Sequence, residues 1–297
     1  MSVSGIKVVV LLGWPAWSSL SPPMHEAGFR DVGLDWRYVP LDVPPGNFQV
    51  GLAILEAECV VGANVTIPHK EDAAALVQEL TPRAKAAGAV NTIIKRDGAL
   101  LGDNTDGWGL LRALATRGAT PEGRKAVVFG AGGAARGCCT ALVQAGVSEL
   151  VVLNRTPERA RALVDSVLSA SRRPLEARAL AWSQERIDPG FLVEAMEGAG
   201  IVLNTTPVTR EPAVSPIPDE ALGRLRLATG CVFCDMVYRP ASTALIRQGQ
   251  ALGLGIVSGL DVLLYQGVPG FEAWTGRKAP VSVMARALRT AAGSEVG

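Results

Sequence analysis

A glycine-rich turn between a short apolar run and a helical stretch is the feature that most constrains the fold of this chain. Residues 126–129 (AVVF) are apolar and rich in β-formers, as in a buried parallel strand. They lead into GAGGAA at 130–135, which fits the pattern G-x-G-x-x-[G/A]. A helix over 134–145 and a second strand over 149–153 would complete a βαβ unit. This context predicts a dinucleotide-binding turn. The alternative is a glycine turn that binds nothing.

The small residues of this turn and the residues after the second strand indicate which dinucleotide. Gly130 permits the tight turn, Gly132 lets the backbone approach a pyrophosphate, and Ala135 allows close packing of the helix, whose N-terminus faces the anion. In NAD-binding proteins an acidic residue about 20 positions past the glycines binds the ribose 2′-hydroxyl. Here Arg155 stands in its place, with Arg159 one helical turn on. Two guanidinium groups suit a 2′-phosphate, so the pattern predicts NADP, the alternative being a solvated arginine pair.

Length and composition limit the class of protein. The chain has 297 residues, of which 48% are hydrophobic and 19% charged, which favours one or two domains with buried cores. A net charge of +1 gives no reason to expect nucleic acid or an anionic membrane as a partner, and no apolar run is long enough for a membrane span. We expect residues 7–12 to form a strand rather than a signal peptide. Cys231 and Cys234 form a lone C-x-x-C, so we expect neither a metal site nor a disulfide. We expect a reduced protein located in the cytoplasm.

Strands and helices alternate along the chain in a way that predicts an α/β fold with two domains. Before residue 104 we expect short strands, a helix over 67–80 with Pro68 in its first turn, and a hairpin around Asp97-Gly98. Residues 165–190 give no clear pattern, and 169–174 are expected to be a loop. The predicted domains are an N-terminal α/β domain, a Rossmann-type domain and a pair of C-terminal helices that pack back on the first domain, with the bounds 1–106, 107–258 and 259–297.

Polar residues close to the predicted strand ends are candidates for a site. NVTIPHK at 64–70 places Asn64 and Thr66 at the carboxyl end of a buried strand, where such sheets bind ligands, and Lys70 in the first turn of a helix. A lysine there meets the positive end of the helix dipole, which is unfavourable unless it serves a purpose such as acid–base catalysis; an exposed surface lysine is the alternative. GDNTDG at 102–107 and the serines at 18, 19 and 21 could cap helices, and these serines could also hold a carboxylate or a polyol.

Taken together, these motifs resemble the shikimate dehydrogenase family over nearly the whole chain. In the family's order they are SLSP at 19–22, NVTIPHK at 64–70, AVNT at 89–92, GDNTDG at 102–107, GAGGAA at 130–135, NRT at 154–156, NTTP at 204–207, DMVY at 235–238 and YQG…WTG at 265–276. The resemblance implies a substrate-binding catalytic first domain and an NADP-binding second domain. It further implies the NADP-dependent, reversible reduction of 3-dehydroshikimate to shikimate, on the route to chorismate and the aromatic amino acids.

The resemblance also implies a role for individual residues. Lys70 and Asp106 would be catalytic. The residues implied to bind substrate are Ser19, Ser21, Thr66, Asn91, Tyr238 and Gln266. Those implied to hold NADP are Gly130, Ala131, Gly132, Gly133, Ala134, Ala135, Asn154, Arg155, Thr156, Arg159, Thr205, Thr206, Val237 and Gly259. No metal is implied, and we expect a monomer or a homodimer.

Three positions depart from the family's pattern. Ser18 stands where a histidine is usual, Glu26 where an asparagine is usual, and Val262 where a methionine is usual. The first two are close in sequence to the serines implied to hold the substrate carboxylate. One alternative is therefore a quinate/shikimate dehydrogenase that uses NAD. A second is a non-catalytic NADP-binding regulator on the same fold, against which the retained Lys70 and Asp106 argue.

Overall fold

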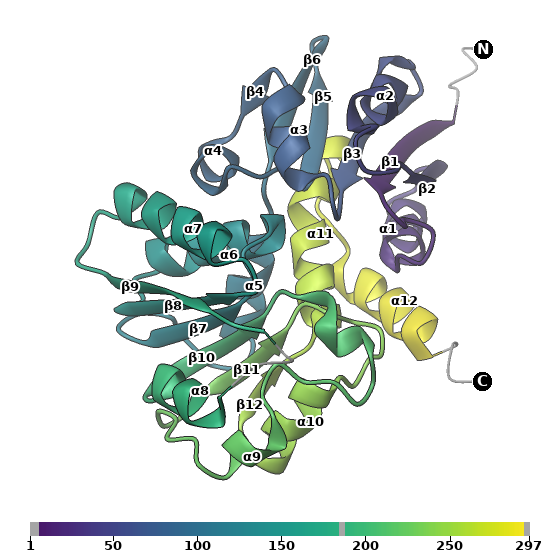
Figure 1. Ribbon diagram of the computed structural model, residues 1–297. Helices are drawn as coiled ribbons and strands as arrows, with labels where there is room; N and C mark the ends of the chain where they lie inside the picture. The colour runs from purple at the N-terminus through teal and green to yellow at the C-terminus, as the bar shows by residue number, and fades with distance from the viewer. Residues whose placement is uncertain (1–5, 184–187, 294–297) are drawn as a thin grey trace, which may run out of the picture. The chain divides into compact units, whose positions relative to one another are not determined.

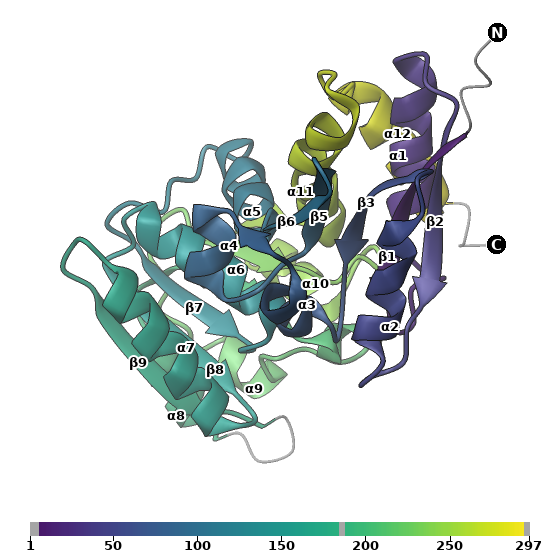
Figure 2. The same cartoon turned by 90° about the horizontal axis from the view of Figure 1, so that it is seen from above.

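Two sheets organise the described part of the chain, one in each of two structural units (Figures 1 and 2). The computed structural model describes residues 6–183 and 188–293. The first unit comprises Met1–Asp106 and Leu263–Gly297, and the second comprises Gly107–Val262. The second change of unit falls inside one helix, α11 (Gly259–Thr275), rather than between helices.

The sheet of the first unit has the strand order β2-β1-β3-β5-β6-β4. Three neighbouring strands, β2, β1 and β3, are parallel, whereas β5 is antiparallel to both β3 and β6. The carboxyl ends of β1, β3 and β6 therefore lie at the same edge of the sheet. The strands are β1 (Lys7–Gly13), β2 (Trp36–Asp42), β3 (Val60–Val65), β4 (Glu79–Leu80), β5 (Thr92–Arg96) and β6 (Ala99–Asp103).

Alternating side chains of this sheet form two apolar layers. On one face Val10, Ala63 and Val65 pack with Phe48 in a buried cluster. On the other face Trp274 lies against the backbone of β3, where a Cβ built on Gly62 would lie only 2.3 Å from the indole Nε1. The helices of this unit are α1 (Ser21–Asp31), α2 (Phe48–Leu52), a 3₁₀ turn (Ala53–Glu56), α3 (Lys70–Leu76), α4 (Pro82–Ala87), most of α11, and α12 (Val281–Gly293), which packs beside α1.

The helix expected over 67–80 is shorter than the sequence suggested. It begins at Lys70 and ends at Leu76, and Pro68 lies in the turn before it rather than in its first turn. The chain becomes extended at Val77, whose buried side chain joins the core, and residues 79–80 then pair with β6. Helix α4 follows at once. The expected hairpin is confirmed, and its turn has positive φ at both Asp97 (51°) and Gly98 (83°), as a two-residue type I′ turn requires.

The sheet of the second unit is parallel throughout and has the order β12-β11-β10-β7-β8-β9. This is the doubly wound order, in which the direction of winding reverses between β7 and β10. In open sheets of this kind ligands bind outside the carboxyl ends of the strands at that point. The strands are β7 (Lys125–Phe129), β8 (Glu149–Asn154), β9 (Glu176–Ala181), β10 (Ala199–Asn204), β11 (Val232–Asp235) and β12 (Gly255–Val257).

Helices cover this sheet, and apolar side chains fill the space beneath them. Phe129, Val151 and Phe233 form part of one core with Leu192 of α8 and Leu245 of α10. The helices are α5 (Asp106–Ala115), α6 (Gly133–Gln144), α7 (Pro157–Ala170), α8 (Pro189–Met196), a 3₁₀ turn (Pro207–Arg210), α9 (Asp219–Leu222) and α10 (Ala244–Ala251).

The region 165–190 contains a strand that the sequence did not reveal. Helix α7 continues to Ala170, so only part of the loop expected over 169–174 is present, and β9 then adds to the edge of the sheet beside β8. Its sequence, EARALA, has few β-formers, and each of its side chains is either exposed or half-buried. An edge strand of this kind carries almost no hydrophobic signal. Residues 184–187 of this region lie outside the described residues.

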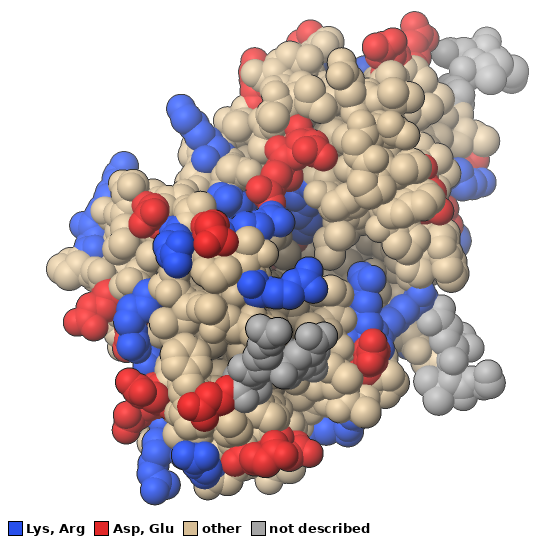
Figure 3. Space-filling view, in the orientation of Figure 1, with Lys and Arg blue, Asp and Glu red and all other residues tan. Residues whose placement is uncertain are grey.

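The face of the molecule drawn in Figure 3 is not dominated by charges of one sign. Figure 3 shows basic and acidic side chains interspersed over the face that it presents, which agrees with the net charge of +1. Of the helices described, none is both long and apolar enough to cross a membrane.

Candidate active site

A buried lysine–aspartate pair lies at the carboxyl edge of the first unit's sheet. Lys70 begins α3 shortly after β3, and Asp106 begins α5 shortly after β6. The Lys70 Nζ donates a hydrogen bond to Asp106 Oδ2 at 2.5 Å, and the two side chains are only 11% and 4% exposed. Buried charges are tolerated when they are paired and hydrogen-bonded, as these are. The pair supplies a proton donor held in place by a carboxylate.

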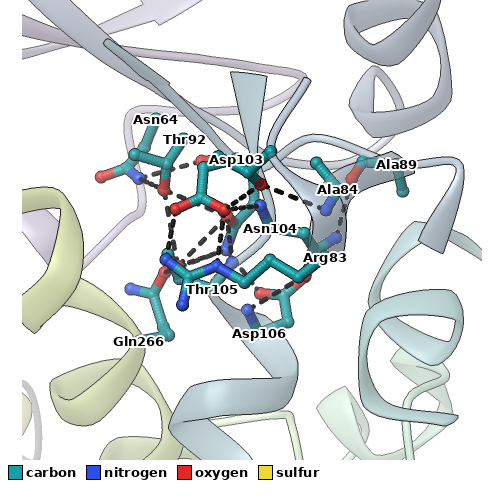
Figure 4. A network of polar contacts seen from close by, with 12 residues as sticks. Asn64, Arg83, Ala84, Ala89, Thr92, Asp103, Asn104, Thr105, Asp106 and Gln266 are labelled. Carbon is teal, nitrogen blue, oxygen red and sulfur yellow. Dashed lines mark hydrogen bonds and ion pairs between the residues drawn. The ribbon is translucent and has the colours of Figure 1, made fainter. Parts of the chain in front are cut away.

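Asn91 connects this pair to other predicted residues. Its Nδ2 donates to Asp106 Oδ1 at 2.9 Å, to Thr105 Oγ1 at 2.9 Å and to Gln266 Oε1 at 3.2 Å. Figure 4 shows Thr105, Asp106 and Gln266 together in this network. Asp106 is thus held on one oxygen by Lys70 and on the other by Asn91. The first unit brings together four of the residues named from the sequence: Lys70, Asn91, Asp106 and Gln266.

The network extends through Asn64, which the sequence placed at the carboxyl end of its strand, to Thr92 and Tyr38, for which the sequence predicted no role. Asn64 Nδ2 donates to the Asn91 carbonyl oxygen at 2.9 Å and to Thr92 Oγ1 at 3.1 Å. The Tyr38 hydroxyl in turn donates to Asn64 Oδ1 at 2.7 Å. All four residues are buried, and polar groups in apolar strands are the signal that could have found Tyr38 and Thr92. They fix the backbone from which the Asn91 side chain projects.

Asp103 anchors the loop that leads to Asp106. Arg83 donates to both of its carboxylate oxygens, with Nε at 2.6 Å from Oδ1, and the Thr81 hydroxyl donates to Oδ1 at 2.6 Å. Burial by itself would raise the pKa of Asp103, but these hydrogen bonds and the charge of Arg83 outweigh it and hold the pKa below its usual range. Asp103 therefore anchors the start of the loop as a charged carboxylate. Asn104 fixes the end of the loop, because its Oδ1 accepts a hydrogen bond from the Asp106 N–H at 3.2 Å.

Ser19, Ser21 and Thr66 lie after neighbouring strands at the same sheet edge. Ser19 Oγ accepts a hydrogen bond from the Ser21 N–H at 3.1 Å, and Ser21 is the first residue of α1. Thr66 follows β3, and its N–H donates to the Leu12 carbonyl of β1 at 2.9 Å. The hydrogen bonds described for the network around Asn91 include none of these three hydroxyls. Tyr238, also named from the sequence, belongs to the second unit.

The glycine turn after β7 has the geometry that a bound pyrophosphate needs. Gly130 has φ of +109°, and a Cβ there would lie 2.3 Å from Thr205 Oγ1, so no other residue fits. A Cβ on Gly132, in contrast, would meet no atom of the described residues within 4 Å. Packing therefore does not require glycine at 132, whereas close approach of an anion does. Helix α6 begins at the next residue with N–H groups that have no partner inside the helix.

The residues after β8 suit a phosphorylated ribose. Asn154 ends the strand, and its Nδ2 donates to the Thr156 carbonyl oxygen at 2.9 Å, which closes the turn. Arg155 lies in this turn, and Arg159 lies in the first turn of α7; both are exposed. The first acidic residue after the strand, Glu158, pairs with Arg161 at 3.5 Å. Two cations without a carboxylate at the strand end fit NADP better than NAD.

Two features first seen in the sequence have structural explanations. Glu26, which stands where the family usually has an asparagine, uses Oε1 to accept a hydrogen bond from the Tyr38 N–H of edge strand β2 at 3.1 Å.

Cys231 and Cys234 are both buried, and burial raises the pKa of Cys231 to about 12, which makes a reactive thiolate unfavourable. Across residues 6–183 and 188–293, no three His, Cys, Asp or Glu side chains gather as a metal site would require.

Comparison with known proteins shows which family this chain resembles. Residues 11–93 match the family described as the shikimate dehydrogenase substrate binding domain, residues 113–190 match shikimate / quinate 5-dehydrogenase, and residues 259–289 match the shikimate 5′-dehydrogenase C-terminal domain. Shikimate dehydrogenase (NADP(+)) of Rubrobacter xylanophilus is 45% identical over 95% of each chain. The enzyme of the same name from Symbiobacterium thermophilum is 42% identical over 96% of this chain and 93% of the relative.

A solved structure extends the similarity to three dimensions. Shikimate 5-dehydrogenase of Thermus thermophilus, in complex with NADP(H) and shikimate, superposes with a TM-score of 0.81. The two sequences are 34% identical, and the match covers 96% of this chain and 100% of the other. Because both sequence and fold agree over nearly their full lengths, this chain belongs to the shikimate dehydrogenase family.

Proposed function

We propose that this protein catalyses the reversible, NADP-dependent reduction of 3-dehydroshikimate to shikimate, the step of that family on the route to chorismate and the aromatic amino acids. The observation that carries the proposal is the buried Lys70–Asp106 pair, with Asn91 and Gln266 bonded beside it. A proton donor next to several buried hydrogen-bonding groups suits a small polyhydroxylated ketone.

Lys70 is the proton donor in this mechanism. When bound, NADPH supplies the hydride that reduces the keto carbon. The keto oxygen gains negative charge as its carbon is reduced, and Lys70 Nζ gives it a proton. Asp106 Oδ2 holds the ammonium group in place, and after proton transfer Lys70 regains a proton from solvent. In the oxidation of shikimate the same lysine, in its neutral form, accepts the hydroxyl proton.

The first unit would bind the substrate. Ser19 and Ser21 hold its carboxylate, whereas Thr66, Asn91, Asp106 and Gln266 bind the ring hydroxyls. Support for the hydroxyl assignment comes from burial, because Asn91, Asp106 and Gln266 are each less than 10% exposed and already share hydrogen bonds. Tyr238 of the second unit also contacts the substrate in this proposal.

The second unit would bind NADP, in line with the cofactor of the relatives. Its turn from Gly130 to Ala135 holds the pyrophosphate, and Arg155 and Arg159, with Asn154 and Thr156, hold the 2′-phosphate end. Thr205, Thr206, Val237 and Gly259 would line the nicotinamide end. The positions of the first two support this, since they follow β10 across the switch point from Gly130. In domain terms, 1–106 with 259–297 would bind substrate and 107–258 would bind cofactor, with Gly259 at the boundary on the cofactor side.

One experiment separates this function from both alternatives. Initial rates are measured for shikimate and quinate, each with NADP and with NAD. We expect the highest kcat/KM for shikimate with NADP. A preference for quinate with NAD would instead identify a quinate/shikimate dehydrogenase. Binding of NADPH without turnover of any pair would identify a regulator.

The location and assembly are further proposals. We propose a cytoplasmic protein, because all five cysteines are free thiols and four of them are buried, as suits a reducing compartment. We expect a monomer or a homodimer, which light scattering during size-exclusion chromatography decides.

A further inference from the structure

A buried polar cluster joins the carboxyl ends of two neighbouring strands in the second unit. Asn204 ends β10 and Asp235 ends β11, and the two residues are register partners in the sheet. Asn204 Nδ2 donates to Asp235 Oδ1 at 2.9 Å. The Thr243 hydroxyl donates to the other carboxylate oxygen, Oδ2, at 2.7 Å. All three residues are fully buried, so this is a costly arrangement unless each group is satisfied, and each is.

The two strand-end residues shape the loops that follow them. Asn204 Oδ1 accepts hydrogen bonds from the Thr206 N–H at 3.0 Å and from the Thr206 hydroxyl at 2.6 Å. Asp235 Oδ1 accepts from the Val237 N–H at 3.0 Å. Thr243 caps helix α10, where its Oγ1 accepts from the Ile246 N–H at 3.3 Å. One cluster therefore sets two loops and a helix start at once.

The second of these loops is also held from its other side. A Cβ built on Gly259, at the start of α11, would lie 2.4 Å from the Val237 carbonyl oxygen and 2.8 Å from the Tyr238 nitrogen. The backbone at 237–238 is therefore confined between Asp235 and Gly259. Burial raises the pKa of Asp235, against the opposing effect of its hydrogen bonds to Thr243, Val237 and Asn204. Asp235 is fully buried, and the hydrogen bonds that satisfy its carboxyl group are also the ones that hold the following loop and the start of α10.

The position of the cluster in the sheet indicates that task. A doubly wound sheet has two mononucleotide-binding halves. Strands β7, β8 and β9 carry the glycine turn and Arg155, so this half would take the adenosine end. Strands β10, β11 and β12 form the other half, which leaves the nicotinamide end to the loops after β10 and β11.

We propose that Asn204, Asp235 and Thr243 are positioning residues that preorganise the Thr206 and Val237 loops for the nicotinamide half of NADP. The proposal rests on the NADP-binding function proposed above. These three residues should therefore affect the binding of the nicotinamide half of NADP and not the binding of its adenosine half. The adenosine half depends on residues of the other half of the sheet.

The test compares two ligands on variants of the full chain. NADPH carries both halves, whereas adenosine 2′,5′-bisphosphate carries only the adenosine half with its 2′-phosphate. Asp235→Asn and Thr243→Val are expected to weaken NADPH by roughly tenfold, because each disrupts a buried hydrogen bond. The same variants should bind the bisphosphate with the parent's affinity, and Thr243→Ser should restore NADPH binding. Both dissociation constants come from isothermal titration.

Thr140 provides a matched control in the same unit. It is buried in α6, and its hydroxyl has no hydrogen-bond partner among the described residues. Thr140→Val therefore makes the same substitution as Thr243→Val without touching the cluster, and both ligands should bind unchanged. Equal weakening of both ligands by Thr243→Val, or unchanged NADPH binding, would overturn the proposal.

A measurement on the parent protein covers the case in which the variants do not fold. Preorganised loops keep their hydrogen bonds before any ligand binds. Amide hydrogen exchange at Thr206 and Val237 should therefore be slow in the free protein and change little when NADPH is added. Fast exchange that slows only with NADPH would contradict the proposal. If the parent binds neither ligand, the NADP assignment itself fails, and the exchange rates alone decide the role of the cluster.

Discussion

Lys70 Nζ and Asp106 Oδ2 lie 2.5 Å apart in a buried position, although 36 residues separate them in the chain. The sheet of the first unit brings them together, because β3 and β6 deliver them to the same edge. Asn91 then holds the second oxygen of Asp106 at 2.9 Å. These hydrogen bonds restrict both charged groups and give the lysine one orientation.

Replacing Lys70 should slow the chemical step and leave substrate binding largely intact. Lys70→Met keeps the length of the side chain and removes its proton, so kcat should fall by about 10²–10⁴-fold, the usual contribution of general acid–base catalysis. Steady-state kinetics and calorimetric titration of shikimate measure the two effects separately. Lys95→Met is the matched control, because Lys95 Nζ donates only to the Ala57 carbonyl oxygen in the contacts described. Near-normal kcat for Lys70→Met would remove this lysine from the chemistry.

Asp106→Asn should impair both turnover and binding. The amide keeps the size of the carboxyl group but cannot pair electrostatically with Lys70, and it presents one acceptor fewer to a ring hydroxyl. We expect a lower kcat together with a higher KM for shikimate. A rise in KM with kcat unchanged would show that Asp106 binds substrate without assisting Lys70.

Arg155 should distinguish the two cofactors. A hydrogen bond to a charged group contributes about 1.5–3 kcal/mol, so Arg155→Ala should weaken NADP roughly ten- to a hundredfold and leave NAD nearly unchanged. Dissociation constants for both cofactors test this. Arg161→Ala serves as the control, since Arg161 lies on α7, the helix that follows Arg155, and pairs with Glu158 at the surface. If both cofactors lose affinity equally, Arg155 is structural.

Ser19, just before α1, and Ser21, the first residue of α1, should act on the substrate and not on the cofactor. Ser19→Ala and Ser21→Ala are each expected to raise KM for shikimate while NADP affinity stays constant. Ser282→Ala on α12, an exposed position, is the control. A lower melting temperature with KM unchanged would favour helix capping, which the Ser19 hydroxyl already performs in part by accepting from the Ser21 N–H.

His25 should make the protein sensitive to acid. It is fully buried, neither ring nitrogen has a hydrogen-bond partner in the described chain, and burial lowers its pKa from 6.5 to about 3. Between these two values the unfolded state binds a proton that the folded state does not. The stability that depends on neutral His25 is therefore complete above pH 6.5 and is lost progressively as the pH falls toward 3.

His25→Phe tests this dependence on pH. The ring stacks on Tyr38 at a centroid distance of 4.8 Å, and an aromatic replacement keeps that contact without a titrating group. Urea unfolding between pH 7 and 4 should show a shallower loss of stability in the variant than in the parent, with equal slopes above pH 7. Parallel curves over the whole range would assign the acid sensitivity to other groups.

The sequence predicted those parts of the fold that have strong hydrophobic runs. The strands around Val127 and Val151 are continuous apolar segments, and their positions are confirmed. Strand β9 was missed because its side chains at the sheet edge are only partly buried. The end of α3 was misplaced because Val77 leaves the helix to join the core, a tertiary effect that local pattern does not contain.

The candidate site was predicted unevenly for a related reason. Lys70 could be singled out from its sequence surroundings, whereas the role of Asp106 came from the family resemblance, and the pairing of the two depends on which strands are neighbours. Gln266 lies 175 residues from Asn91, and only the family resemblance drew attention to it. Asn204 and Asp235 belong to motifs that were recognised, yet the hydrogen bond between them follows from strand register alone. The roles assigned to these residues stay predictions.

The hydrogen bond between Glu26 and Tyr38 also bears on whether the edge of the first unit's sheet can pair with another chain. Strand β2 is an edge strand, and such strands can recruit a second chain through their outward N–H groups. The Tyr38 N–H points outward and is occupied by Glu26, and two residues along, at the next outward position, Pro40 has no N–H to offer. The middle of this edge therefore has no donors left for another strand. Growth of the sheet by strand addition, a common route to aggregation, is blocked there by one carboxylate and one proline.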